Sequence, residues 1–119
     1  MSEKAQEVLS PLGIEGGPTQ EQIDNWKSKF GDIYVATFNP TEKYIYRPLK
    51  RFEYKQILQT GQAPENRTFS EEKIVEKCII WPRIEPTSLS TMKAGTISTL
   101  VDLIMASSNF GITEEPVKL

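Results

Sequence analysis

The chain contains few side chains of the kinds that carry out catalysis. Cys78 is the only thiol among 119 residues, and the sequence has no histidine that could act as its general base. Cys78 lies between Lys77 and Ile79 in a segment with helical spacing, where a free cysteine behaves as a small buried hydrophobe. We therefore interpret Cys78 as a core residue and expect no catalytic residues.

The other groupings of polar residues lack the spacing that catalysis or ion binding requires. Carboxylates stand side by side at Glu71–Glu72 and at Glu114–Glu115, but adjacent side chains on a helix point apart, so neither pair predicts an acid–base dyad. The run Gly16–Pro18 is not followed by the lysine and hydroxyl residue of a phosphate-binding loop. Without histidine, and with one cysteine, we expect no metal site, no cofactor and no enzymatic activity.

Charge and hydropathy disfavour two further classes of partner. The formal net charge is −2, and the densest basic stretch, Arg47–Arg51, holds three charges and is followed by Glu53. A nucleic-acid-binding domain is expected to carry a basic face, so we do not expect a nucleic-acid partner. The longest apolar runs are far shorter than a membrane span, and we expect no membrane insertion.

The pattern predicts one α+β domain over residues 19–112, mainly helical with one β-hairpin, in the order α-β-β-α-α-α. Thr19 and Gln22 have the spacing of a capping box at the start of a helix over 20–30. The hairpin is expected over 33–47 around a turn at 39–42, because its flanks are rich in β-branched and aromatic residues. Three helices are expected after it, from Pro48 to Gly61, from Ser70 to Pro82, and around residues 97–105.

Both ends of the chain are expected to lie outside this domain. Residues 1–18 contain glycines and prolines that interrupt regular structure, together with apolar residues, which predicts a flexible or docking leader. Residues 113–119 are mostly polar and are expected to form a C-terminal tail.

The aromatic side chains of the hairpin leave two interpretations open. Tyr44 and Tyr46 share one face of the hairpin and oppose Ile45, so both faces are fairly apolar. One face must pack on the helices, and the other either packs as well or meets a partner protein. A groove bordered by large side chains could accept an apolar helix of a partner. The candidate partner-binding residues are Tyr44, Tyr46, Tyr54, Leu58 and Trp81, of which the last four border that hypothetical groove.

Several phrases of the sequence resemble a known group of phage proteins. They are YIYRPLKRFEYKQIL (Tyr44–Leu58), EEKIVEKCIIWP (Glu71–Pro82), the pair Gly95–Thr96 before the last helix, and NFG (Asn109–Gly111). Across residues 19–111, this order resembles the small tail assembly chaperones and related small tail proteins of bacteriophages. The leader, residues 1–18, is a departure from the pattern of that family.

The resemblance implies a non-enzymatic protein of phage tail assembly. Its partner would be another phage tail protein, such as the tape-measure protein, whose apolar segments it would bind in the host cytoplasm during assembly. One alternative is a stoichiometric structural component of the tail or baseplate that stays in the virion, with the leader wedged into a neighbouring subunit. A second alternative is a small phage regulator that binds a host protein.

Overall fold

The computed structural model describes residues 11–60, 67–111 and 114–119 and confirms the α+β class. Helices outnumber strands within these ranges, and the first five elements follow the predicted order. In chain order the elements are α2 (Gln20–Phe30), β1 (Tyr34–Asn39), β2 (Glu42–Tyr46), α3 (Arg51–Thr60), α4 (Arg67–Cys78), β3 (Ile79–Trp81), the 3-10 helix η2 (Pro86–Thr91) and α5 (Ala94–Ser107).

Helix α2 has the start and the end that the sequence predicts. The Gln22 backbone N–H donates to Thr19 Oγ1 at 3.1 Å, and the Thr19 N–H donates to Gln22 Oε1 at 2.9 Å. This capping box satisfies two of the backbone donors that a helix start leaves without partners. The helix ends at Gly31, whose φ of 82° favours glycine.

The sheet contains a third strand that the sequence analysis did not predict. Strands β1 and β2 form the expected antiparallel hairpin, and β3 pairs antiparallel with β2, which makes β2 the central strand. The helix expected to reach Pro82 ends at Cys78 instead. Ile79, Ile80 and Trp81 favour extended backbone because they are β-branched or aromatic, and Pro82 disfavours helical backbone at Trp81.

Two other helix boundaries differ from the prediction. Helix α3 begins at Arg51 and not at Pro48, because a side chain further along the helix caps the backbone of Lys50. Helix α4 begins at Arg67, three residues before the predicted start at Ser70. The predicted end of α3 at Gly61 lies outside the described residues.

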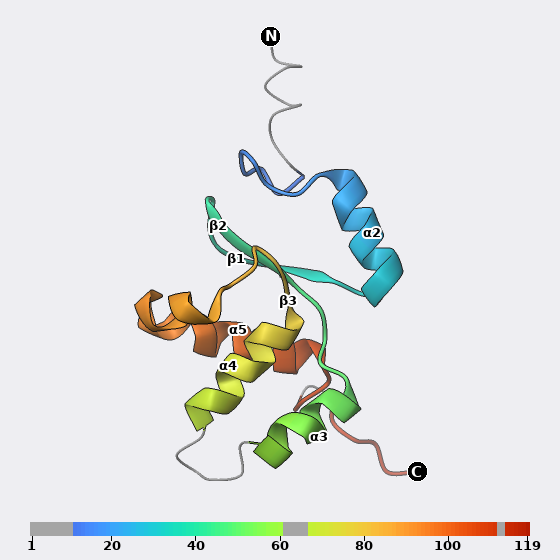
Figure 1. Ribbon diagram of the computed structural model, residues 1–119. Helices are drawn as coiled ribbons and strands as arrows, with labels where there is room; N and C mark the ends of the chain where they lie inside the picture. Colours follow the sequence, from blue (N-terminus) through green and yellow to red (C-terminus); the bar gives the residue numbers. More distant parts are fainter. Residues whose placement is uncertain (1–10, 61–66, 112–113) are drawn as a thin grey trace.

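The main core lies between one face of the sheet and the helices α3, α4 and α5. Helices α4 and α5 lie on one side of the sheet, whereas α2 and the segment before it lie on the other (Figure 1). The side chains of this core are all buried: Ala36, Tyr44, Tyr46, Leu49, Ile57, Ile74, Val75, Cys78, Leu100, Val101 and Ile104.

The opposite face of the sheet is partly covered by the chain itself. Ile45 is only 1% exposed although it does not belong to the main core cluster, and Pro18 is also fully buried. Lys43 Nζ donates to the Leu12 carbonyl oxygen at 2.6 Å. Residues 11–18 of the expected leader therefore pack on the domain, whereas residues 1–10 lie outside the described part of the chain.

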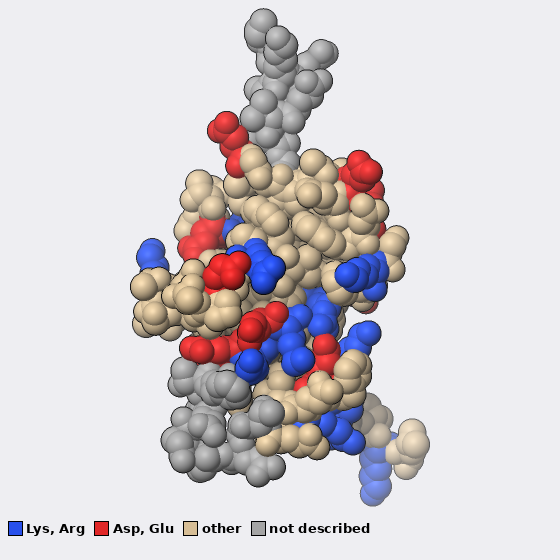
Figure 2. All heavy atoms as spheres, viewed as in Figure 1, with Lys and Arg blue, Asp and Glu red and all other residues tan. Residues whose placement is uncertain are grey.

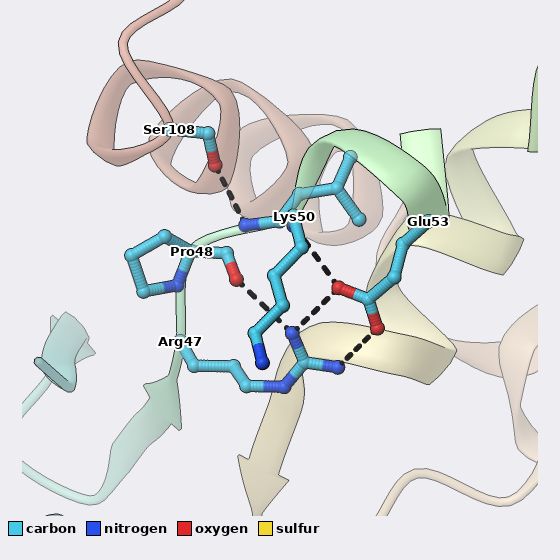
Figure 3. Close-up of polar contacts among 6 residues, drawn as sticks. Arg47, Pro48, Lys50, Glu53 and Ser108 are labelled. Carbon is cyan, nitrogen blue, oxygen red and sulfur yellow. Dashed lines mark hydrogen bonds and ion pairs between the residues drawn. The ribbon is translucent and has the colours of Figure 1, made fainter. Parts of the chain in front are cut away.

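The connection from β2 to α3 is fixed by a partly buried ion pair. The Arg47 guanidinium donates to Glu53 Oε1 at 2.9 Å and to Oε2 at 2.7 Å, and the two groups face each other in Figure 3. The Lys50 N–H also donates to Glu53 Oε1, which caps the start of α3. Ser108, beyond α5, accepts a bond from the Leu49 N–H at 2.8 Å. The basic stretch Arg47–Arg51 therefore includes one arginine, Arg47, with a structural role.

This pairing changes the titration of both groups. The hydrogen bonds from Arg47 hold the pKa of the Glu53 carboxyl below its usual value, and the bond to Glu53 raises the pKa of Arg47. Burial alone would shift both groups the other way, so the pairing outweighs the cost of removing the charges from water.

Candidate functional site: a groove between α4, β3 and η2

Tyr44 and Tyr46, two of the predicted partner-binding residues, lie in the core. Both belong to the main core cluster, and the Tyr46 hydroxyl lies 3.0 Å from Ser107 Oγ, at hydrogen-bond distance. The Tyr44 hydroxyl donates to Glu42 Oε2 at 2.9 Å. A ring that is buried in the folded domain cannot contact a partner. The burial of these two tyrosines therefore fits the core-packing interpretation and not a partner-facing role.

Of the other three predicted residues, Tyr54 and Leu58 lie on one face of α3, whereas Trp81 lies on β3. Tyr54 is half-buried on α3 and packs against Phe110, with ring centroids 4.9 Å apart. Leu58 is exposed towards the end of α3, and Trp81 is half-buried at the end of β3, opposite Ile45. Since Tyr46 lies inside the core, these residues do not form the single groove that the sequence analysis proposed.

A different hollow lies between α4, β3 and η2, with a volume of about 350 Å³. We call it the α4–η2 groove. Its apolar lining comes from Val75, Ile79, Ile80, Ile84, Pro86 and Leu89, and its charged lining from Glu72, Glu76 and Arg83.

The groove results from the abrupt change of backbone direction after α4. Val75 on α4 and Ile79 at the start of β3 both line the groove, so its apolar lining continues from the helix into the strand. The chain then turns away through a cis peptide bond between Trp81 and Pro82. Helix η2 starts with Pro86, and proline suits a first helical position because the backbone N–H that it lacks would have no partner within the helix there. The Ser88 N–H donates to the Glu85 carbonyl at 2.8 Å.

The rim of the groove is charged and asymmetric. Glu72 and Glu76 are four residues apart and so lie on the same face of α4, whereas Arg83 lies on the connection opposite. Glu76 lies 3.2 Å from Lys73, and Arg83 lies 3.3 Å from Glu85. Figure 2 shows acidic and basic side chains gathered on the face that carries α4 and β3. An apolar ligand with a basic group would match the α4 side of this rim.

The described residues offer little of the chemistry that catalysis needs. Burial raises the pKa of the Cys78 thiol to about 12, so this thiol is a poor nucleophile near neutral pH. No three metal-ligating side chains stand together in residues 11–60, 67–111 and 114–119. A second hollow of about 220 Å³ lies beside Tyr54 and Phe110, with Lys50 and Arg51 at its edge, and it has no buried ionisable group aimed into it.

Sequence reasoning missed the α4–η2 groove, although part of its signal was present. The run Ile79–Ile80 provides more apolar side chains than one face of α4 requires, and Ile84 and Leu89 are apolar residues in a mostly polar connection. The groove itself depends on η2 folding back beside α4, which is a tertiary arrangement.

Comparison of the chain with models of protein families, with curated proteins and with solved structures gives no match. Within the described ranges, no helix has the length and apolar character needed to cross a lipid bilayer.

Proposed function

We propose that this protein acts by binding another protein, and that it accommodates an apolar segment of that partner in the α4–η2 groove. The apolar lining of the groove beside a charged rim is the observation that carries the proposal. Such a combination suits a segment that is apolar on one side and polar on the other, because the lining removes apolar surface from water while the rim remains hydrated.

The biological role that fits this activity best is assembly of a bacteriophage tail. The resemblance of residues 19–111 to tail assembly chaperones supports this role, with the tape-measure protein as the expected partner. The protein would then act without catalysis in the host cytoplasm during assembly.

The alternative of a structural component of the tail or baseplate, located in the virion, has less support. Under that alternative, the leader, residues 1–18, would wedge into a neighbouring subunit. Residues 11–18 already pack on the protein's own sheet, with Pro18 buried and the Leu12 carbonyl bonded to Lys43. This packing favours a chaperone that is complete on its own.

A binding assay with groove variants tests the proposal. The purified chain is titrated with a candidate tape-measure protein, and the heat of binding is recorded. Leu89→Ser removes apolar surface from the groove and is expected to weaken binding about tenfold or more, since burying a leucine contributes about 1.5–3 kcal/mol. Glu76→Lys reverses the charge of the rim and is expected to weaken binding of a basic segment.

Matched controls keep this test specific. Leu103 on α5 is 38% exposed and does not line the groove, so Leu103→Ser is the control for Leu89→Ser. Glu21→Lys on α2 is the control for Glu76→Lys. Circular dichroism verifies that each variant folds. Equal binding by the groove variants and the controls would remove the groove from the proposal.

Counting copies of the chain in purified virions separates the two phage roles. An assembly chaperone is abundant in infected-cell lysate and absent from virions. A fixed number of copies per virion would support the structural alternative.

A further inference from the structure

Strand β1 leaves one edge of the sheet without a neighbouring strand. Strand β2 pairs with β1 on one side and β3 on the other, and no described strand lies beyond β1. The free edge of a strand carries backbone N–H and C=O groups that another extended backbone can pair. Three large side chains along this edge are exposed, namely Tyr34 (39%), Val35 (48%) and Phe38 (36%).

The usual features that protect a strand edge are scarce in β1. The sequence Tyr34–Asn39 contains no charged residue and no proline, both of which oppose edge-to-edge pairing. One irregularity occurs between Thr37 and Asn39, next to the hairpin turn. A bulge at this point protects only the end of the edge and leaves Tyr34–Thr37 regular.

We propose that β1 pairs antiparallel with β1 of a second copy of this chain, about a two-fold axis at Ala36, so that the two sheets become one. This inference goes beyond the proposed function and does not depend on it. With Ala36 on the axis, Val35 lies opposite Thr37 of the second copy, and Tyr34 lies beside Phe38 of the second copy. Cross-strand pairs of β-branched and of aromatic residues are among those that stabilise antiparallel sheets.

The charges at the two ends of β1 favour this antiparallel pairing. Lys27 and Lys29 in the last turn of α2 and Asp32 between α2 and β1 leave one net positive charge before the strand. Glu42 follows the hairpin turn at the other end, and the ammonium group of the adjacent Lys43 is bonded to the Leu12 carbonyl. Antiparallel pairing brings the basic end of each copy towards Glu42 of the other, whereas parallel pairing would place like charges together.

The shape of the surface allows the same arrangement. A shallow hollow adjoins the start of β1 and is lined by residues from Lys27 to Tyr34. In the antiparallel arrangement the hairpin turn of the second copy, Asn39–Glu42, falls over this hollow.

The test measures the mass of the full chain as a function of its concentration by sedimentation velocity. We expect a reversible monomer–dimer equilibrium for the wild-type chain. Thr37→Lys places a charge on the exposed edge and is expected to raise the dimer dissociation constant about tenfold or more, because each interface contains the change twice. Thr99→Lys makes the same change on the exposed surface of α5 and should leave the equilibrium unaltered.

A crosslink tests the register. The variant with both Val35→Cys and Thr37→Cys should form a disulfide-linked dimer, whereas Val35→Cys alone should not. Cys78 can stay in place because it is buried. A chain that stays monomeric at every attainable concentration would overturn the proposal, as would equal weakening by Thr37→Lys and Thr99→Lys. Crosslinking by Val35→Cys alone would overturn the two-fold axis at Ala36.

Discussion

Separating Arg47 from Glu53 should destabilise the protein strongly, because both side chains are nearly buried. Their exposed fractions are 12% and 10%, and two hydrogen bonds of 2.9 and 2.7 Å join them. Removing one partner of a buried ion pair leaves the other charge without compensation, which costs about 3–5 kcal/mol. We take the lower end because a tenth of each side chain remains in contact with water.

A double-mutant cycle measures this coupling. Arg47→Met and Glu53→Leu should each lower the free energy of unfolding by about 3 kcal/mol. The double variant should lose no more than one single variant, because no uncompensated charge remains, so the coupling is at least about 3 kcal/mol. Glu53→Leu also removes the cap on Lys50, but this loss occurs in both arms of the cycle and cancels.

The assay is urea unfolding followed by circular dichroism and tryptophan fluorescence. Lys73–Glu76 serves as the control pair, since its side chains are 41% and 40% exposed and its coupling should stay below about 0.5 kcal/mol. Additive losses for Arg47 and Glu53, or a coupling as small as that of the control, would refute the argument that this pair fixes the start of α3.

The same pair predicts the direction of a pH effect. The pKa of Glu53 is lowered in the folded protein, so its contribution to stability is complete above the pKa of the unfolded chain, near 4.3. That contribution is lost as the pH falls through the lower, folded pKa. The difference in unfolding free energy between wild type and Glu53→Leu should therefore be constant at neutral pH and shrink below about pH 4.

Three further outcomes follow from the described contacts. Because burial raises the pKa of Cys78 to about 12, iodoacetamide at pH 8 should alkylate the folded chain at least about a hundredfold more slowly than the chain in urea; equal rates would mean that Cys78 is accessible. Tyr46→Phe removes the hydrogen bond to Ser107 and keeps the ring, and should cost about 1 kcal/mol in urea unfolding; no loss would show that the bond contributes nothing. Lys43→Met removes the bond to the Leu12 carbonyl and should speed thermolysin cleavage near Leu12, whereas an unchanged rate would show that other contacts hold residues 11–18.

The elements that the sequence predicted well have signals within a few residues of one another. The capping box needs only Thr19 and Gln22, and the hairpin needs only its own alternation and turn. Strand β3 has only the weak local signal of its β-branched and aromatic residues, and three residues become a strand only where β2 lies beside them. The start of α3 was misplaced for the same reason, since the contact of Glu53 with Arg47 depends on how the chain folds back.

The candidate site was harder to predict than the fold. Alternation places Tyr44 and Tyr46 on one face of the hairpin, but it does not indicate which face the helices cover. The sequence left open whether the second face packs or meets a partner; that face is partly covered by residues 11–18, whose docking has no local sequence signal. The α4–η2 groove likewise requires the position of η2, which propensity alone cannot supply.

The third strand has a consequence for how the protein folds. Strand β2 ends at Tyr46 and β3 begins at Ile79, and the Arg47 N–H donates to the Cys78 carbonyl at 3.0 Å. This bond closes a loop that contains all of α3 and α4. The entropy of closing that loop must be lost before the β2–β3 pairing contributes any stability. Formation of the sheet edge and packing of both helices should therefore belong to one kinetic step, and amides in β3 and α4 should exchange with solvent at a common rate.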